Sequence, residues 1–194
     1  GELSKIIEIS NPQIQTVTID TIFPAERNKG LLEKRLDEIC REAEKAIDDG
    51  RNIIVLSDRK AGSGSAAIPS LLVCSAVHHH LIRCKKRTRA GLIIESGEPR
   101  EVMHYALLIG YGADAVNPYL AFATIFELEK NGKLKAGGGY GELEYNYIKS
   151  ISKGLLKIFS KMGTSTIRSY RGAQVFEAVG LSERVVDKYF PGTP

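Results

Sequence analysis

Short apolar runs alternate with longer segments of helical periodicity along most of the chain. The run at residues 52–57 is apolar at nearly every position and bounded by polar residues, which predicts a strand covered on both faces. Runs of similar type recur further along the chain. The pattern predicts about five strands, at residues 16–20, 52–57, 90–95, 113–116 and 164–169.

Helical patterns separate these strands. Residues 26–49 place leucine, isoleucine and alanine at helical spacing, and Asp49-Gly50 is expected to end that helix. Pro69 and Pro118 suit the first turn of a helix, with Asn117 as the N-cap of the second. Glycine-rich residues 61–66 are predicted as a flexible loop and 135–142 as a mobile surface loop. The predicted helices are 26–49, 69–85, 100–110, 119–131, 143–162, 172–179 and 182–190.

Strands that alternate with helices predict an α/β fold with parallel pairing and right-handed crossovers. About five parallel strands suffice for a partial or degenerate TIM-barrel-like architecture, and they equally suit an open doubly wound sheet. Periodicity alone does not choose between these two architectures.

Composition fits one ordinary globular domain over residues 1–194. The chain is 43% hydrophobic and 26% charged, which is enough to bury a core. It has no apolar stretch near the roughly 20 residues that cross a bilayer and no secretory signal, so we expect a soluble cytoplasmic protein. Both ends lie close to patterned segments, at Gly1 and at Pro194, as in a domain cut from a longer chain.

The histidines and cysteines invite a metal-site interpretation that their spacing does not favour. His78, His79 and His80 lie in a predicted helix, where neighbouring side chains diverge by about 100° and cannot all face one ion. The cysteines are widely spaced, without a CxxC pair, and are expected to be reduced thiols. We therefore expect no metal-binding residues.

A basic run follows the histidine helix, at Arg83, Lys85, Lys86, Arg87 and Arg89. Such a run could contact the phosphates of a nucleic acid, but cations are also typical of a helix C-terminus. The net charge is only +4, because 27 Lys and Arg are interspersed with 23 Asp and Glu. The absence of aromatic interleaving also favours the structural interpretation, and no nucleic-acid partner is expected.

Polar residues at the ends of the predicted strands form the most serious candidate site. In parallel α/β folds, ligands bind at the carboxyl ends of the strands. If these ends shared one mouth, two carboxylates and several arginines would converge and could hold an anionic ligand. The alternative is that they cap helices or form an interface. The candidates are Asp58, Arg59, Glu95, Asn117, Arg168, Tyr170 and Arg171.

Longer phrases resemble one known family. The runs at residues 75–83, 91–98 and 111–120 are similar to the large subunit of glutamate synthase, as are residues 50–59, 147–157, 161–174 and 185–190. The resemblance covers nearly the whole chain in order and is weakest at 61–67 and 133–145. It places the chain in the later part of the central domain of that subunit.

This resemblance implies a degenerate flavin-type barrel. It also implies membership of a system that converts glutamine, 2-oxoglutarate and reductant into two glutamates. In the family, the amidotransferase nucleophile is an N-terminal cysteine, and the FMN and 2-oxoglutarate residues belong to a barrel that would follow Pro194. The iron-sulfur cluster needs three closely spaced cysteines, which Cys40, Cys74 and Cys84 are not.

No catalytic, cofactor-binding or metal residue of the family can therefore be carried onto this chain. The resemblance implies a connecting domain, not catalytic alone, whose partners are the amidotransferase and FMN-barrel domains in cis or as separate chains, with no membrane partner. Two alternatives stay open. One is a stand-alone partial barrel that binds a phosphorylated ligand or flavin at residues 168–172 and Arg59, and the other is a nucleic-acid-binding module that uses residues 83–89.

Overall fold

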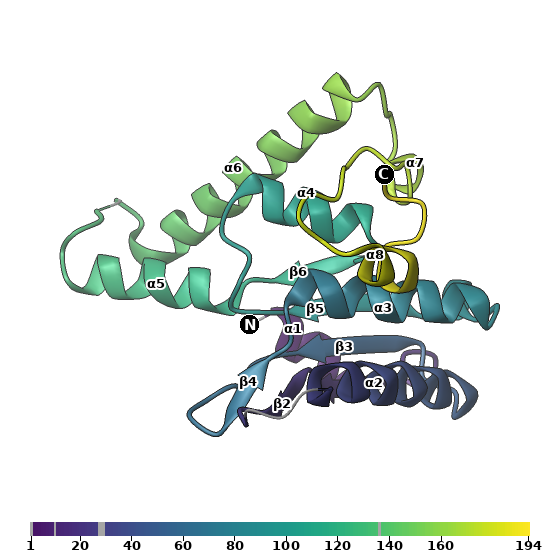
Figure 1. Ribbon diagram of the computed structural model, residues 1–194. Coiled ribbons are helices and arrows are strands. Elements are labelled where there is room, and N and C mark those ends of the chain that lie inside the picture. The colour runs from purple at the N-terminus through teal and green to yellow at the C-terminus, as the bar shows by residue number, and fades with distance from the viewer. Residues whose placement is uncertain (1, 10, 27–29, 136) are drawn as a thin grey trace.

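A computed structural model describes residues 2–9, 11–26, 30–135 and 137–194. Its centre is a four-stranded parallel sheet in which neighbouring strands follow one another along the chain (Figure 1). The strands are β1 (Thr16–Asp20), β3 (Ile53–Ser57), β5 (Gly91–Glu95) and β6 (Ala115–Asn117). Four of the five predicted parallel strands are therefore present.

Strand order distinguishes the two predicted architectures. Helix α2 (Leu31–Asp48) connects β1 to β3, α3 (Ser70–Arg83) connects β3 to β5, and α4 (Val102–Gly110) connects β5 to β6. A doubly wound sheet would reverse direction at a switch point, whereas these strands proceed in one direction across the sheet. The fold is a partial TIM-barrel-like α/β fold.

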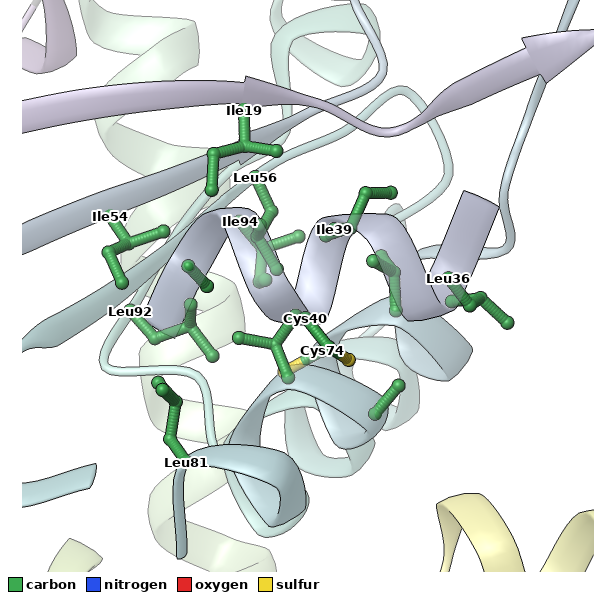
Figure 2. Packing of buried hydrophobic residues seen from close by; sticks show 14 of the residues in the cluster. Ile19, Leu36, Ile39, Cys40, Ile54, Leu56, Cys74, Leu81, Leu92 and Ile94 are labelled. Carbon is green, nitrogen blue, oxygen red and sulfur yellow. The ribbon is translucent and has the colours of Figure 1, made fainter. Parts of the chain in front are cut away.

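The core lies between one face of the sheet and helices α2 and α3 (Figure 2). Alternate strand residues supply it, because successive side chains of a strand point to opposite faces. Cys40 and Cys74 belong to the same cluster, from α2 and α3. The strand residues are Ile19, Ile54, Leu56, Leu92 and Ile94, all below 5% exposed. The side chain of the last residue of each strand consequently points to the other face of the sheet.

The C-terminal half adds helices beyond β6, namely α5 (Tyr119–Lys130), α6 (Gly139–Lys161), α7 (Ile167–Tyr170) and α8 (Glu183–Tyr189). Helix α6 packs on α4 and α5, and Gly154 allows its close approach to α4. A β-carbon on Gly154 would lie 2.5 Å from a methyl group of Val102. Helix α8 packs on α3.

Two predicted elements near the C-terminus are wrong, and an earlier one is wrong in part. Residues 164–169 do not form a strand, because Thr166 caps α7 instead, its hydroxyl accepting a hydrogen bond from Ser169 N at 3.1 Å. Residues 172–179 do not form a helix, since Gly172 and Gln174 have φ of 72° and 54°. Part of the loop expected at 135–142 belongs instead to α6.

Several short elements were not predicted. Strands β2 (Ile22–Pro24) and β4 (Ser65–Ala67) form an antiparallel pair that includes part of the expected loop 61–66. Helix α1 (Glu2–Ile7) and the 3-10 turn η1 (Arg87–Arg89) also lay outside the predictions. Pro118, not Asn117, precedes α5 as its N-cap. Among the residues described, no helix is long and apolar enough to cross a membrane.

Candidate functional site

The carboxyl ends of the four parallel strands carry a row of polar side chains. The sheet register aligns Asp20 with Ser57, Ser57 with Glu95, and Glu95 with Asn117. Because aligned residues of neighbouring strands share one face of a sheet, all four side chains point away from the α2 and α3 core. We call Asp20, Ser57, Glu95 and Asn117 the strand-end row.

Glu95 is the centre of this row and is only 8% exposed. One carboxylate oxygen accepts a hydrogen bond from Ser57 Oγ at 2.6 Å. The other accepts from Arg59, through Nε at 2.9 Å and Nη2 at 2.7 Å, and from Asn117 Nδ2 at 3.3 Å. Glu95 therefore cross-links β5 to both neighbouring strands.

Asp58, directly after β3, is 4% exposed and serves the adjacent loop. Its carboxylate accepts hydrogen bonds from the hydroxyl of Ser96 and from the backbone N–H of Gly97. Glu98 then accepts from the backbone N–H and hydroxyl of Ser70, at 2.7 and 2.6 Å, at the first turn of α3. The buried carboxylate of Asp58 and the exposed one of Glu98 thus hold a loop and a helix end in place through hydrogen bonds.

The charge at this edge is predominantly negative. Arg59 is paired with Glu95 and lies over the ring of Tyr119, with its guanidinium carbon 4.2 Å from the ring centre. Lys60 is paired with Asp20 at 2.7 Å. Burial, with the nearby carboxylate of Asp58, raises the pKa of Tyr119 to about 12, so its hydroxyl stays neutral. Two cations, Arg59 and Lys60, thus face four carboxylates at this edge, and the excess of negative charge disfavours an added phosphate. The carboxylates belong to Asp20, Asp58, Glu95 and Glu98.

Arg168, Tyr170 and Arg171 are not at the strand-end row. Residue 171 follows α7, and its guanidinium Nη2 lies 2.6 Å from Asp114 Oδ1, before the first residue of β6. Arg59 is at the opposite end of the strands, so the two-part site expected from residues 168–172 and Arg59 does not form. Tyr170 is fully buried against Phe159, with the ring centres 4.4 Å apart.

Asp114 organises this amino-terminal edge of the sheet. It accepts hydrogen bonds from Arg87 Nη2 and from Leu92 N, both at 2.8 Å. Burial on its own would raise the pKa of Asp114, but these hydrogen bonds and the charges of Arg87 and Arg171 bring it below its ordinary value. Asp114 therefore anchors two arginines, although its own side chain is 35% exposed.

The three consecutive histidines make separate contacts, as helical geometry predicts. His78 Nδ1 accepts from Arg87 Nε at 2.8 Å, and His79 Nδ1 lies 2.9 Å from the carbonyl of Ser75. His80 Nε2 instead lies 3.0 Å from a carboxylate oxygen of Glu44. The run does not converge on one point.

Two residues of the basic run at 83–89, Lys86 and Arg87, are paired within the protein. Arg87 also donates to the carbonyls of Ala90 and Gly112, and its side chain is only 12% exposed. Lys86 lies 2.9 Å from Glu44 and 2.7 Å from Asp48. With these two cations paired internally, only part of the run is left for nucleic-acid phosphates, which favours the structural interpretation. The basic residues of the run that stay exposed are Arg83, Lys85 and Arg89.

Sequence reasoning missed Asp20, Ser57 and Tyr119 as parts of this edge. Asp20 ends a predicted strand, and the same rule that singled out Glu95 would have included it. Ser57 is the last residue of its strand, and only the register reveals that it faces Glu95. Tyr119 gave no signal, because its contact with Arg59 joins a helix start to a distant loop.

The four parallel strands with polar side chains at their carboxyl ends place this protein in the class of partial TIM-barrel-like α/β proteins. The amino-acid sequence then identifies the family. A family model described as the glutamate synthase central domain matches residues 1–182. The chain belongs to the glutamate synthase central-domain family.

Several relatives carry glutamate synthase names. The NADPH glutamate synthase large chain of Bacillus subtilis is 49% identical over 185 residues, which is 95% of this chain and 12% of that protein. The NADH glutamate synthase of Saccharomyces cerevisiae is 43% identical, over 97% of this chain and 9% of that protein. The ferredoxin-dependent enzyme of Pyropia yezoensis is 41% identical, over 100% of this chain and 13% of that protein. The chain therefore corresponds to a segment of much longer proteins.

A solved structure agrees with the fold. A mutant flavocytochrome b2 with pyruvate bound superposes with a TM-score of 0.57, covering 94% of this chain and 57% of that one. The two share 14% sequence identity, so the similarity supports the barrel-like arrangement of strands and helices and nothing more specific.

Proposed function

We propose that this chain is a connecting domain of glutamate synthase, with no catalytic activity when it is separated from the rest of the enzyme. The parent reaction converts glutamine, 2-oxoglutarate and reductant into two glutamates, in amino-acid biosynthesis and ammonia assimilation. The observation that carries the proposal is the internal pairing of Asp58, Arg59, Glu95 and Asn117, the polar groups that a barrel enzyme would present to a substrate. These groups stabilise the strand ends.

The cysteines do not fit the iron-sulfur cluster of the parent family. Burial raises the pKa of Cys40 to about 11 and that of Cys74 to about 12. Cluster ligands are thiolates, so these two protonated thiols within the α2 and α3 core do not suit a cluster that needs three cysteines. The strand-end row, with its excess of carboxylates, is likewise a poor cradle for the phosphate of FMN.

Exposed apolar side chains support a connecting role. Helix α6 lies along the outside of the fold (Figure 1) and exposes Tyr145, Ile148 and Leu156, the last at 66%. Near the C-terminus, Val179 is 88% exposed. Apolar groups in such positions are typical of surfaces that pack against other domains. We assign them to contacts with the amidotransferase and FMN-barrel domains.

A chimera tests this proposal. The matching segment of the Bacillus subtilis large chain is replaced by this chain, and glutamate formation is measured beside that of the chain alone. We expect an active chimera and an isolated chain with neither glutamate formation nor flavin absorbance. Glutamate formation or bound flavin in the isolated chain would overturn the proposal.

Substitutions in the chimera separate packing from folding. Leu156→Glu and Val179→Glu place a charge on the exposed apolar surface, so we expect reduced glutamate formation with an unchanged circular dichroism spectrum of the isolated chain. Lys157→Glu, on the adjacent exposed position of α6, is the matched control and should retain activity. Equal losses in all three variants would show that charge alone, and not an apolar contact, is responsible.

A further inference from the structure

Three potential metal ligands from two helices meet on the surface formed by α2 and α3. Glu44 belongs to α2, His80 to the last turn of α3, and Cys84 is the C-cap residue of α3. Their ligand atoms all lie within 4.8 Å of one another. His80 Nε2 is 3.0 Å from Glu44 Oε2 and 3.6 Å from Cys84 Sγ, so one ring nitrogen faces both partners.

These separations suit a small tetrahedral ion. Zinc bound to sulfur at about 2.3 Å and to nitrogen at about 2.0 Å places these two atoms about 3.5 Å apart, and it places nitrogen and oxygen ligands about 3.4 Å apart. The observed 3.6 Å between His80 Nε2 and Cys84 Sγ agrees with this geometry. The 3.0 Å between His80 and Glu44 requires a small outward movement of one side chain.

The second oxygen of Glu44 is held by another residue. Lys86 Nζ donates to Glu44 Oε1 at 2.9 Å and to Asp48 at 2.7 Å. Glu44 Oε2 is thus directed toward His80 while Oε1 stays bonded to the lysine. Outer hydrogen bonds of this kind orient metal ligands in known sites.

The protonation of the cluster is compatible with a cation. Hydrogen bonds from Lys86 and then from His80 lower the pKa of Glu44 to about 2, so its carboxylate is ionised at neutral pH. Burial, followed by the charge of Glu44, raises the pKa of Cys84, so the thiol carries its proton until a metal replaces it. Metal binding would release that proton.

The ligand types select the class of ion. A thiolate with an imidazole and one carboxylate favours zinc or cobalt over calcium or magnesium, which prefer oxygen ligands. The side chains of Glu44 and His80 are 31% and 22% exposed, so an ion from solution can reach them. Within the described part of the chain, three protein ligands are grouped here, which leaves a fourth position for water.

We propose that Glu44, His80 and Cys84 bind one divalent zinc-like ion that fastens α2 to the end of α3. The site differs from the metal site that the histidine run first suggests, because His78 and His79 point to other partners. It is also independent of the glutamate synthase reaction. Its sequence signal is the i, i+4 spacing of His80 and Cys84, which a search for paired histidines overlooks.

Titration of the purified chain with Co²⁺ tests the site. We expect one equivalent to bind, with visible bands of tetrahedral intensity and a near-ultraviolet thiolate-to-cobalt absorption, and Zn²⁺ should displace it. Zinc should also raise the melting temperature, because an ion that binds only the folded state stabilises it. Weak octahedral bands, or no uptake at equimolar metal, would overturn the proposal.

Variants assign the ligands. Cys84→Ser should lose the thiolate absorption, and Glu44→Gln and His80→Gln should lose one-equivalent uptake at micromolar metal. His79→Gln is the matched control, one residue away on the same helix, and it should bind as the unmodified chain does. Circular dichroism verifies that each variant is folded. Uptake that survives in Cys84→Ser but disappears in His79→Gln would place the ion on the histidine run and refute the site.

Discussion

Gly112 and His78 lie so close that residue 112 has no room for a side chain. A β-carbon on Gly112 would lie 2.4 Å from both Cγ and Nδ1 of the His78 ring. Gly112 also has a φ of +120°, which side-chain-bearing residues rarely adopt. Arg87 fixes the pair, since it donates to the carbonyl of Gly112 and to His78 Nδ1, at 2.7 and 2.8 Å.

Gly112→Ala is therefore expected to lower the free energy of unfolding by about 2 kcal/mol or more, from the combined cost of a strained φ and of overpacking. Urea unfolding followed by circular dichroism measures this change. Gly132→Ala is the control, because Gly132 has a φ of +69° but no atom within 4 Å of its added β-carbon. Similar losses in both variants would assign the effect to backbone strain and remove any role for His78.

His78 should remain neutral at mildly acidic pH. Burial, with the charge of Arg87, lowers the pKa of His78 from 6.5 to about 3. Below pH 6.5 the His78 side chain binds a proton in the unfolded chain but not in the folded chain. The free energy of unfolding therefore decreases as pH falls from 6.5 toward 3. The slope contributed is at most about 1.4 kcal/mol per pH unit.

NMR titration of the imidazole and urea unfolding across this pH range measure the two effects. In His78→Asn the amide oxygen can still accept from Arg87 but does not titrate, so we expect a shallower dependence of stability on pH. A His78 ring that titrates near 6.5 would contradict the prediction.

Asp114→Asn should weaken the amino-terminal edge of the sheet. The pKa of Asp114 is lower in the folded chain than its ordinary value of 3.8. The stabilisation that its ionised carboxylate provides is therefore present above pH 3.8 and is lost as pH falls through the folded value. At neutral pH we expect the variant to be less stable than the unmodified chain, and the difference should narrow in acid. Urea unfolding at several pH values measures it, and a difference that does not vary with pH would count against the pairing with Arg87 and Arg171.

Glu95→Gln should destabilise the strand-end row by about 1–3 kcal/mol, because charge-assisted hydrogen bonds to a buried carboxylate are lost. The amide of the variant must also turn its NH2 group toward Ser57 or Arg59. Lys60→Met, which removes the exposed pair with Asp20, is the contrasting variant and should cost no more than about 1 kcal/mol. Thermal or urea unfolding compares the two. A loss in Lys60→Met equal to that in Glu95→Gln would show that burial is not the deciding factor.

Local sequence patterns located most of the central elements. Buried runs identified β1, β3, β5 and β6 within about two residues, and helical spacing identified α2, α3 and α4, because each signal comes from neighbouring residues in the chain. The general rule for parallel strands then led to Asp58, Arg59, Glu95 and Asn117. Their shared position at one edge follows from the strand direction alone.

The same local signals failed where they were weak. The β-branched residues at 164–169 suit a strand, yet the hydroxyl of Thr166 caps a short helix, which moves Arg168 and Arg171 away from the strand-end row. Strands β2 and β4 have three residues each and pair over a long separation, so no periodic pattern marks them.

The sequence by itself determined the central strands and helices, their order and the family, since each depends on residues that are adjacent or regularly spaced. Only the tertiary structure decided which groups meet. Glu44 reaches His80 from another helix, and Gly112 presses on His78 from a turn that follows α4. Such contacts depend on the packing of segments far apart in the chain. The local sequence around each residue therefore does not indicate which distant residue it will contact.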